Sequence, residues 1–262
     1  MITLIHPEIN PVIVSFGELS IRWYGLSYVI GLVIGYYIIK KINKSLINPI
    51  DNKVIEEFFI WTALGVIIGG RIGYVLFYQT YSIFYNPLEI FYIWKGGMSF
   101  HGGLIGTFFS TILFSKNKKI NFYILTDFIV TAVPVGIFFG RIANFINMEL
   151  YGRVTSFYFA MQFPLIDTNR RHPSQLYEAF FEGLVIFIIL IFLIRKNFIN
   201  NRFGINTSIF LITYGIFRFF LEYLREPDAH IGLLLDYFTM GQLLSIPMII
   251  AGFAIYFLKH KK

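Results

Sequence analysis

The residues with the clearest potential for chemistry lie between positions 214 and 225. Tyr214, Arg218, Glu222 and Arg225 are spaced by four, four and three positions, which places them along one face of a helix. The surrounding sequence is apolar, and ionisable side chains inside a membrane are rare and commonly functional. An ion pair between Arg218 and Glu222 could be purely structural, because opposite charges relieve each other's desolvation. The functional alternative is that Glu222 orients Arg218 towards a phosphate.

A second group of polar residues lies in the segment GRIANFINMELYGR. Its charged and amide side chains fall within thirteen positions: Arg141, Asn144, Asn147, Glu149 and Arg153. This density is costly in lipid, so we expect the segment to border a cavity or the membrane interface. Arg71 ends a similar glycine-bearing apolar run, and we expect Arg71, Arg141 and Arg218 to line one cavity. Because arginine binds phosphate through two parallel hydrogen bonds, an anionic phospholipid is the predicted ligand.

His101 lies in the segment GGMSFHGGLIG, between two pairs of glycines. A lone histidine is more often a satisfied polar group or a helix cap than a catalytic residue. Glycine, however, lets a substrate come close, and a neutral imidazole can accept a proton at physiological pH. We therefore predict that His101 is a candidate general base.

Several kinds of chemistry are excluded by what the sequence lacks. There are no cysteines, which removes disulfides, thiolate metal sites and a cysteine nucleophile. The sequence also contains no D-x-x-D array, P-loop, dinucleotide-binding fingerprint or H-E-x-x-H motif. We therefore expect no metal site and no cofactor.

Long apolar segments must position these candidate residues. Of the 262 residues, 56% are hydrophobic and only 14% are charged, whereas a soluble domain carries about 25% charged residues. Seven apolar runs of about membrane-spanning length lie at 23–39, 58–78, 98–114, 122–146, 177–194, 209–224 and 238–258. The sequence predicts an all-α polytopic membrane protein with seven transmembrane helices, forming a single domain over 1–262.

The basic residues predict the orientation of these helices. Of the 22 lysines and arginines, eleven lysines and two arginines follow odd-numbered spans. Short cytoplasmic loops retain basic residues, so we expect the N-terminus outside and the C-terminus in the cytoplasm. Residues 148–174 would then form a small extracytoplasmic head between the fourth and fifth spans. Because orientation accounts for thirteen of the 22 basic residues behind the net charge of +7, we expect no nucleic-acid partner.

The chain resembles the prolipoprotein diacylglyceryl transferases of bacterial cytoplasmic membranes. The resemblance is carried by the segments IRWYGLSY, GGMSFHGGLIG, GRIANFINMELYG, RHPSQLYEA and YGIFRFFLEYLREPD, and it covers nearly the whole chain. Two positions depart from the family pattern, since many members carry glycine at Met148 and tryptophan at Tyr151. The resemblance implies a seven-helix fold in the bacterial inner membrane, with the active site facing the outer side.

The resemblance also implies a reaction. Members transfer the diacylglyceryl group of phosphatidylglycerol to the lipobox cysteine of a preprolipoprotein, forming a thioether and releasing glycerol phosphate. The family's important residues fall on Tyr24, His101, Arg141, Asn144, Glu149, Gly152, Tyr214, Arg218 and Glu222. We expect His101 to assist thiol deprotonation, while Arg141 and Arg218 bind the phosphodiester and the other residues orient the substrate. Arg71 is added from the sequence pattern alone, as a further substrate-binding residue.

Two other functions fit part of the pattern. A transporter or lipid flippase also has glycine-bearing helices and buried charges, but it needs polar groups in the inner half, where we find little beyond Asp127. A non-catalytic membrane scaffold would not need intramembrane arginines.

Overall fold

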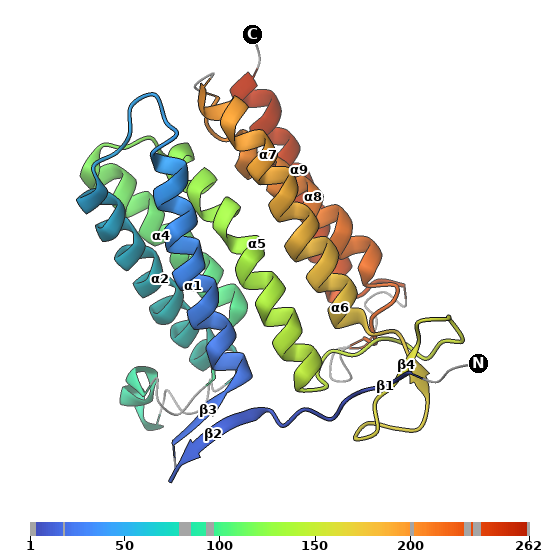
Figure 1. The fold of residues 1–262 in the computed structure, drawn as a ribbon. Helices are drawn as coiled ribbons and strands as arrows, with labels where there is room; N and C mark the ends of the chain where they lie inside the picture. Colours follow the sequence, from blue (N-terminus) through green and yellow to red (C-terminus); the bar gives the residue numbers. More distant parts are fainter. Residues whose placement is uncertain are drawn as a thin grey trace. The chain divides into compact units, whose positions relative to one another are not determined.

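The computed structural model describes residues 4–17, 19–78, 85–92, 97–199, 202–227, 232 and 237–260. The chain forms two compact units, one made of Met1–Ile47 with Asp127–Lys262 and the other of Asn48–Thr126. Each unit consists mainly of helices (Figure 1). The prediction of an all-α architecture is therefore confirmed.

The larger unit contains the helices at the first, fourth, fifth, sixth and seventh predicted spans. Its elements are α1 (Trp23–Asn43), most of α5 (Phe122–Ile146), α6 (Ser174–Glu178), the π-helical segment η3 (Ala179–Val185), α7 (Ile186–Ile199), α8 (Ile205–Leu221) and α9 (Met240–His260). α6, η3 and α7 follow one another without a break and form one helical rod (Figure 1). α8 packs closely on α9, where a Cβ on Gly252 would lie only 2.9 Å from the carbonyl oxygen of Ser208.

The smaller unit is built on a pair of closely packed helices, α2 (Asn52–Tyr78) and α4 (Phe100–Lys118), together with the short helix η1 (Pro87–Phe91). Glycines form the contact between α2 and α4. A Cβ on Gly73 would lie 2.7 Å from the Cα of Gly102, and a Cβ on Gly69 would lie 2.8 Å from the Cα of Gly106. Small residues allow this approach in lipid, where hydrophobic driving force between helices is absent.

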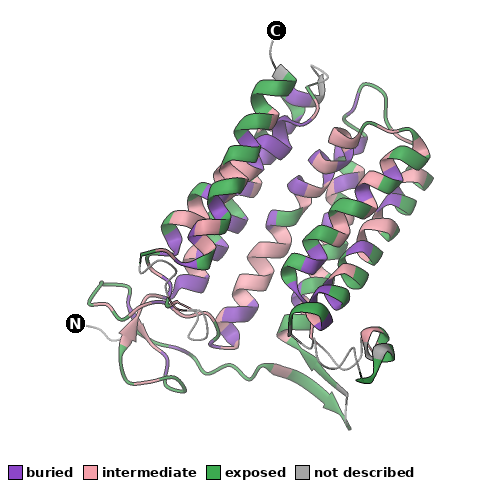
Figure 2. Cartoon of the chain, turned by 180° about the vertical axis from the view of Figure 1, so that it is seen from behind, coloured by how far each residue is buried: buried purple, intermediate pink, exposed green. Residues whose placement is uncertain are grey.

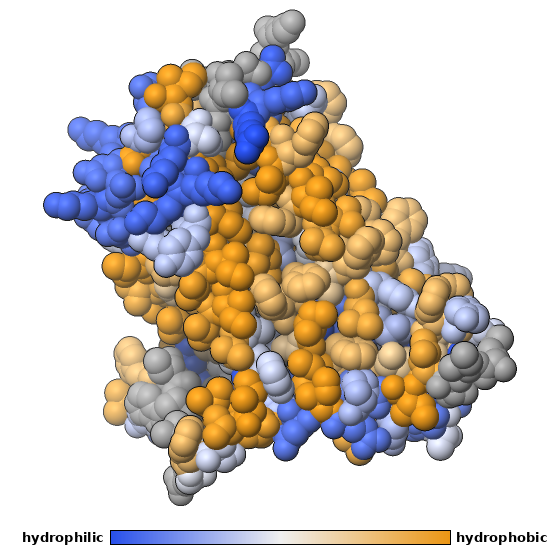
Figure 3. Space-filling model, viewed as in Figure 1, coloured by the Kyte–Doolittle hydropathy of each residue, from blue (hydrophilic) through white to orange (hydrophobic). Residues whose placement is uncertain are grey.

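Within the part of the chain that the structure describes, five helices are long and apolar enough to cross a membrane: Trp23–Asn43, Asn52–Phe77, Phe122–Ile146, Ser174–Asn197 and Met240–Lys259. They correspond to five of the seven predicted spans. α8 is a shorter apolar helix, and α4 occupies the remaining predicted position. Exposed residues run along the outer faces of the helices (Figure 2), and many are apolar, such as Phe192, Phe257 and Leu258. Apolar side chains cover the middle parts of the helices, with hydrophilic side chains gathered near the ends (Figure 3).

Short strands flank the helices of the larger unit. β2 (Val12–Phe16) and β3 (Leu19–Arg22) form an antiparallel hairpin before α1. A small sheet has the order β1 (Leu4–Ile5), β4 (Met161–Gln162) and β5 (Arg170–Arg171). β4 and β5 lie in the segment that the sequence predicts to be a head, and β1 adds the N-terminal segment to it in parallel. Isolated bridges join Val154 to Arg171 and Gly152 to Arg225, so the segment is tied to the residues after α8.

Candidate active site

Two arginines and two glutamates meet in the interior of the larger unit. Arg141 Nη1 lies 3.1 Å from Oε2 of Glu178, and Arg141 Nη2 lies 3.2 Å from Oε2 of Glu182. Arg218 Nη1 lies 2.8 Å from Oε1 of Glu178 and 3.6 Å from Oε1 of Glu182. The two arginines therefore share the same two carboxylates.

Two further residues extend this arrangement. Arg218 Nη2 pairs with Glu222, and Arg225 Nη1 lies 3.5 Å from Oε1 of Glu178. We name the six residues the Arg–Glu cluster: Arg141, Glu178, Glu182, Arg218, Glu222 and Arg225. With all six side chains ionised, three positive charges balance three negative charges. A buried ionic group is tolerated when its members are paired in this way, because an unpaired buried charge is very costly.

The helices of the larger unit position the cluster. Arg141 comes from α5 and Arg218 from the last turn of α8. Glu178 ends α6, and Glu182 lies four positions later in the π-helical segment. π-Helical turns inside α-helices occur frequently at functional sites. Both glutamates are fully buried, whereas the side chains of Arg141 and Arg218 are 16% and 14% exposed, so the arginines form the accessible part of the cluster.

The end of α8 differs from the prediction. The helix ends at Leu221, and Glu222 is its C-cap. Arg225 lies beyond the helix, in a bridge to Gly152, so the prediction that it continues the helical face of Arg218 is wrong. Glu222 fits against the start of α9 because Gly241 has no side chain, and a Cβ there would lie 2.6 Å from the Glu222 carboxyl carbon.

Asn144, in the last turn of α5, and Glu149, just after that helix, form a second polar group. Asn144 Nδ2 donates to Oε2 of Glu149 at 3.2 Å, and Asn147 Nδ2 donates to Oε1 of the same carboxylate at 3.2 Å. Gln175 Nε2 donates to the backbone oxygen of Glu149 at 2.6 Å. Gly152 lies where two backbones meet, since a Cβ on it would lie 2.6 Å from the carbonyl oxygen of Leu224.

The two predicted tyrosines lie on different helices. Tyr214 is on α8, one turn before Arg218, and its ring stacks on Phe210 with 5.5 Å between centroids. Tyr24 begins α1 and is partly exposed, with its hydroxyl 3.4 Å from that of Tyr28. Both are placed in the same unit as the Arg–Glu cluster.

His101 and Arg71 belong to the smaller unit. His101 is exposed in the first turn of α4, and its ring contacts Phe100 edge-on at 5.7 Å. Arg71 is buried on α2, where Nη1 donates to the carbonyl oxygen of Gly97 at 3.4 Å and the guanidinium lies over the Tyr74 ring. The roles predicted for both residues stay predictions.

Comparisons with known proteins identify the family. The sequence model of the family described as prolipoprotein diacylglyceryl transferase matches residues 11–258. The chain is 50% identical to the phosphatidylglycerol–prolipoprotein diacylglyceryl transferase of Rickettsia bellii, over 94% of each sequence. It is 51% identical to the protein of the same name from Rickettsia typhi, over 95% of this chain and 96% of its relative. The chain belongs to the prolipoprotein diacylglyceryl transferase family. It is accordingly a multi-pass membrane enzyme of the transferase class.

At Met148, where this diacylglyceryl transferase departs from the family pattern, the backbone adopts an unusual conformation. Met148 has φ +54°, and Leu150 has φ +56°. This left-handed region is open to glycine at little cost and is unusual for other residues. The chain therefore turns sharply out of α5 with a methionine where many members of the family carry glycine.

Two residues of the cluster in this diacylglyceryl transferase were missed by the sequence analysis. Glu178 and Glu182 lie in the segment YEAFFEGLVIF, and although Glu178 falls within the resemblance segment RHPSQLYEA, no site role is predicted for either residue. The spacing of four within an apolar helix was a usable signal, because acidic side chains inside a membrane helix face a protein interior and pair with other charges.

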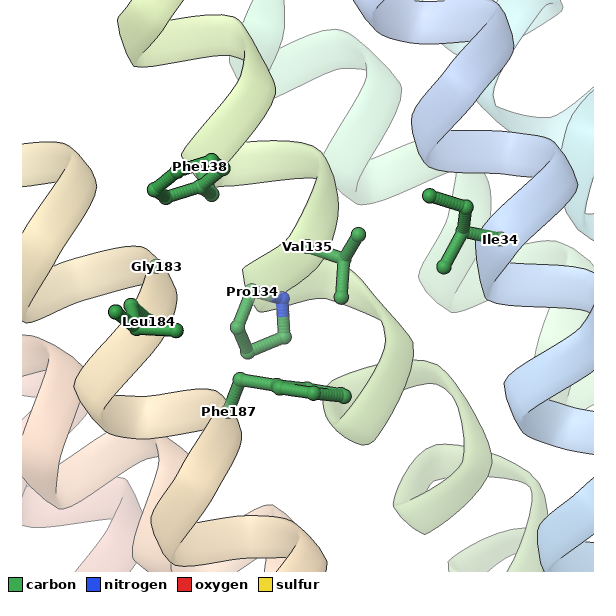
Figure 4. A pocket seen from close by; sticks show the side chains of 7 residues that line it. All are labelled: Ile34, Pro134, Val135, Phe138, Gly183, Leu184 and Phe187. Carbon is green, nitrogen blue, oxygen red and sulfur yellow. The ribbon is translucent and has the colours of Figure 1, made fainter.

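An apolar pocket of about 230 Å³ lies one helical turn from the cluster of this transferase. Its walls come from α1, α5 and the rod formed by η3 and α7: Ile34, Pro134, Val135, Phe138, Gly183, Leu184 and Phe187. Phe187 and Leu184 lie opposite Pro134 of α5, and Ile34 lies opposite Val135 (Figure 4). Gly183 follows Glu182 directly in the chain, and Phe138 precedes Arg141 by three positions.

Proposed function

We propose that this chain transfers the diacylglyceryl group of phosphatidylglycerol to the lipobox cysteine of a preprolipoprotein, forming a thioether and releasing glycerol phosphate. The family membership of the chain supports the reaction. The observation that carries the site is the pair of arginines, Arg141 and Arg218, held on a common pair of buried carboxylates. Their guanidinium groups are pre-oriented donors for an anionic headgroup.

The cysteine sulfur attacks the glyceryl carbon, and the bond from that carbon to the phosphate oxygen breaks. Arg141 and Arg218 bind the phosphodiester and stabilise the charge that develops on the leaving oxygen. Preorganised donors of this kind typically lower a barrier by about 3 kcal/mol each.

The thiol must lose its proton before it attacks, because its pKa is about 8.5 in the absence of help. We assign this step to His101, which is exposed at the start of α4. A His101→Gln variant that kept full transfer at neutral pH would remove His101 from this role.

The other predicted residues orient the substrates. Glu222 fixes Arg218 through their ion pair, and Asn144 with Glu149 shapes the polar segment after α5. Gly152 lets the backbones of this segment and of Leu224 approach. Tyr24 and Tyr214 contribute hydroxyls towards the headgroup, and Arg71 is a further substrate-binding residue. The apolar pocket beside the cluster suits an acyl chain, because its walls are apolar throughout.

The expected setting is the bacterial inner membrane. The apolar runs predict seven spans, and the lysine distribution predicts that the N-terminus lies outside and the C-terminus in the cytoplasm. Residues 148–174 then form an extracytoplasmic head within a single membrane domain, and the active site faces the outer side. The partners are phosphatidylglycerol and lipobox peptides, with no nucleic acid.

The decisive experiment uses the full chain in detergent with phosphatidylglycerol and a synthetic lipobox peptide. We expect the peptide to gain the mass of one diacylglyceryl unit. A peptide with serine in place of cysteine is the control and should gain nothing. Absence of the mass increase on the cysteine peptide would refute the proposed activity, and a transporter would produce no such adduct.

A further inference from the structure

The charge balance of the Arg–Glu cluster constrains how an anion can bind there. Without a ligand, three arginines face three glutamates. A phosphodiester adds one negative charge and competes with the glutamates for Arg141 and Arg218. The cluster would then carry an uncompensated negative charge in a site largely closed to water, which is costly unless one group becomes neutral.

Of the three carboxylates in the cluster, that of Glu182 makes the weakest contacts with the arginines. Its only hydrogen bond among the described residues comes from Arg141 at 3.2 Å, while Oε1 lies 3.6 Å from Arg218 and accepts none. Glu178 contacts three arginines, and Glu222 pairs closely with Arg218. A competing phosphate would therefore displace Glu182 before the other two carboxylates.

The Glu182 side chain is fully buried. The next residue, Gly183, packs against α5, where a Cβ on Gly183 would lie 2.8 Å from the Cα of Phe138. The neighbouring pocket has apolar walls, so it offers an ionised carboxylate no polar partner. A carboxylate that loses its arginines and stays buried takes up a proton, because the neutral acid is far cheaper to bury than the ion.

We propose that the phosphate of the lipid replaces Glu182 as the partner of Arg141 and Arg218. Glu182 then binds one proton as the lipid binds. The identity of the lipid rests on the proposed function. The charged and titratable groups facing Glu182 are Arg141 from α5, Glu178 from its own helical rod, and Arg218 and Tyr214 from α8. Tyr28 of α1 faces Arg141 rather than Glu182.

This coupling has a measurable consequence for lipid affinity. If one proton is taken up with each lipid, the affinity falls by up to about tenfold for each unit of increasing pH. Glu182→Gln keeps the size of the side chain and resembles the protonated acid, with one acceptor oxygen and one donor group, but it cannot take up a proton. The variant should bind phosphatidylglycerol with an affinity that does not change between about pH 6 and 8.

The test is calorimetric titration of the full-length protein in detergent with short-chain phosphatidylglycerol, in buffers of different ionisation enthalpy. We expect an uptake of about one proton per lipid in the unchanged protein and about none in Glu182→Gln. Binding without proton uptake in the unchanged protein overturns the inference and leaves the proposed function intact. Absence of any binding instead counts against the proposed lipid site itself.

Two further measurements assign the proton to Glu182. Glu226→Gln is the matched variant, because Glu226 pairs with Arg171 outside the cluster, and it should retain the uptake; loss of uptake in this variant would overturn the assignment. Infrared difference spectroscopy of the unchanged protein needs no variant that must fold. Addition of phosphatidylglycerol should produce the carbonyl band of a protonated carboxylic acid, and its absence would overturn the proposal.

Discussion

Asp127 on α5 binds Thr207 in the first turn of α8, eighty positions later in the chain. Its Oδ1 accepts hydrogen bonds from the backbone N–H of Thr207 at 2.8 Å and from the Thr207 hydroxyl at 2.7 Å. Its Oδ2 accepts from the N–H of Gly204 at 2.7 Å. α8 begins after Gly204, which has no side chain to cap the helix, so α5 supplies the cap. Asp127 therefore has a structural role, which removes the polar residue that best suited a transport pathway.

Replacement of Asp127 by alanine should destabilise the protein strongly. The variant leaves the first N–H groups of α8 buried without their acceptor, which costs about 2 kcal/mol or more. Asp51 also caps a helix, by accepting from the N–H of Lys53, but it is exposed. Asp51→Ala should cost less, about 1 kcal/mol. Chemical unfolding of both variants in detergent would measure the difference, and equal losses would contradict the role of burial.

Glu178→Gln should lower stability more than any other single neutralisation in the Arg–Glu cluster, because Glu178 contacts three arginines. Removing one partner of a buried ionic group typically costs about 3–5 kcal/mol. The double variant Glu178→Gln with Arg225→Gln restores the charge balance. We expect it to recover about 1–2 kcal/mol relative to the sum of the single losses. A double-mutant cycle of unfolding free energies checks this, and strict additivity would argue against direct coupling.

Gly152→Ala should prevent normal folding or activity. The new Cβ would lie 2.6 Å from both the Cβ of His172 and the carbonyl oxygen of Leu224, and the carbonyl belongs to backbone that cannot rotate away. Gly140 on α5 is the control, because a Cβ there meets nothing within 4 Å. Gly140→Ala should be neutral or raise stability by up to about 1 kcal/mol. Melting temperatures in detergent would separate the variants.

Protonation of the His6 imidazole should lower the stability of the protein in mild acid. Its Nε2 donates to the carbonyl oxygen of Phe145 at 2.9 Å, while Nδ1 accepts from the N–H of Glu8 at 3.0 Å. Burial lowers the pKa of His6 below its ordinary value of 6.5, against the opposing effect of the Phe145 hydrogen bond. The unfolded chain therefore binds the proton more readily, so this stabilisation is present above about pH 6.5 and is lost as the pH falls.

The measurement is the melting temperature between about pH 7.5 and 5. His6→Gln should reduce the slope of that decline, although its stability at neutral pH will be lower. Burial lowers the pKa of His172 as well, so the slope should become smaller without vanishing. An unchanged slope would contradict the contribution of His6.

Arg71→Ala should raise the concentration of phosphatidylglycerol needed for half-maximal transfer more than it lowers stability. This follows if its guanidinium contributes to the cationic surface that attracts the headgroup. Its contacts with Gly97 and Tyr74 favour a structural role as the alternative. Transfer assays at limiting lipid, alongside melting temperatures, distinguish the two, since equal activity at limiting lipid would assign Arg71 to structure alone.

The sequence was sufficient for features that depend on local pattern. Apolar runs predicted the helices, and the spacing of Tyr214, Arg218 and Glu222 predicted a charged end of α8. The close glycine contact between α2 and α4 also follows a local rule, since residues four positions apart share one helix face.

Features that depend on tertiary pairing were not predictable in this way. Glu178 and Glu182 look like isolated acids in an apolar span, and only the packing of α5 and α8 against that span reveals their partners. The cap on α8 joins Asp127 and Thr207, which are eighty positions apart, and no local sequence motif predicts it. The end of α8 at Leu221 was misplaced because the charge spacing continues where the helix does not.

The distribution of the Arg–Glu cluster along the chain also affects how the protein enters the bilayer during synthesis. Arg141 emerges from the ribosome first, so the helix that carries Glu178 and Glu182 arrives with one cation available for two acids. Glu178 and Glu182 lie near the start of Ser174–Asn197, away from the centre of the helix, where an ionised side chain costs roughly 3 kcal/mol on insertion. Arg218 emerges thirty-six residues after Glu182, so we expect the pairing of these acids to be completed only when α8 has been synthesised.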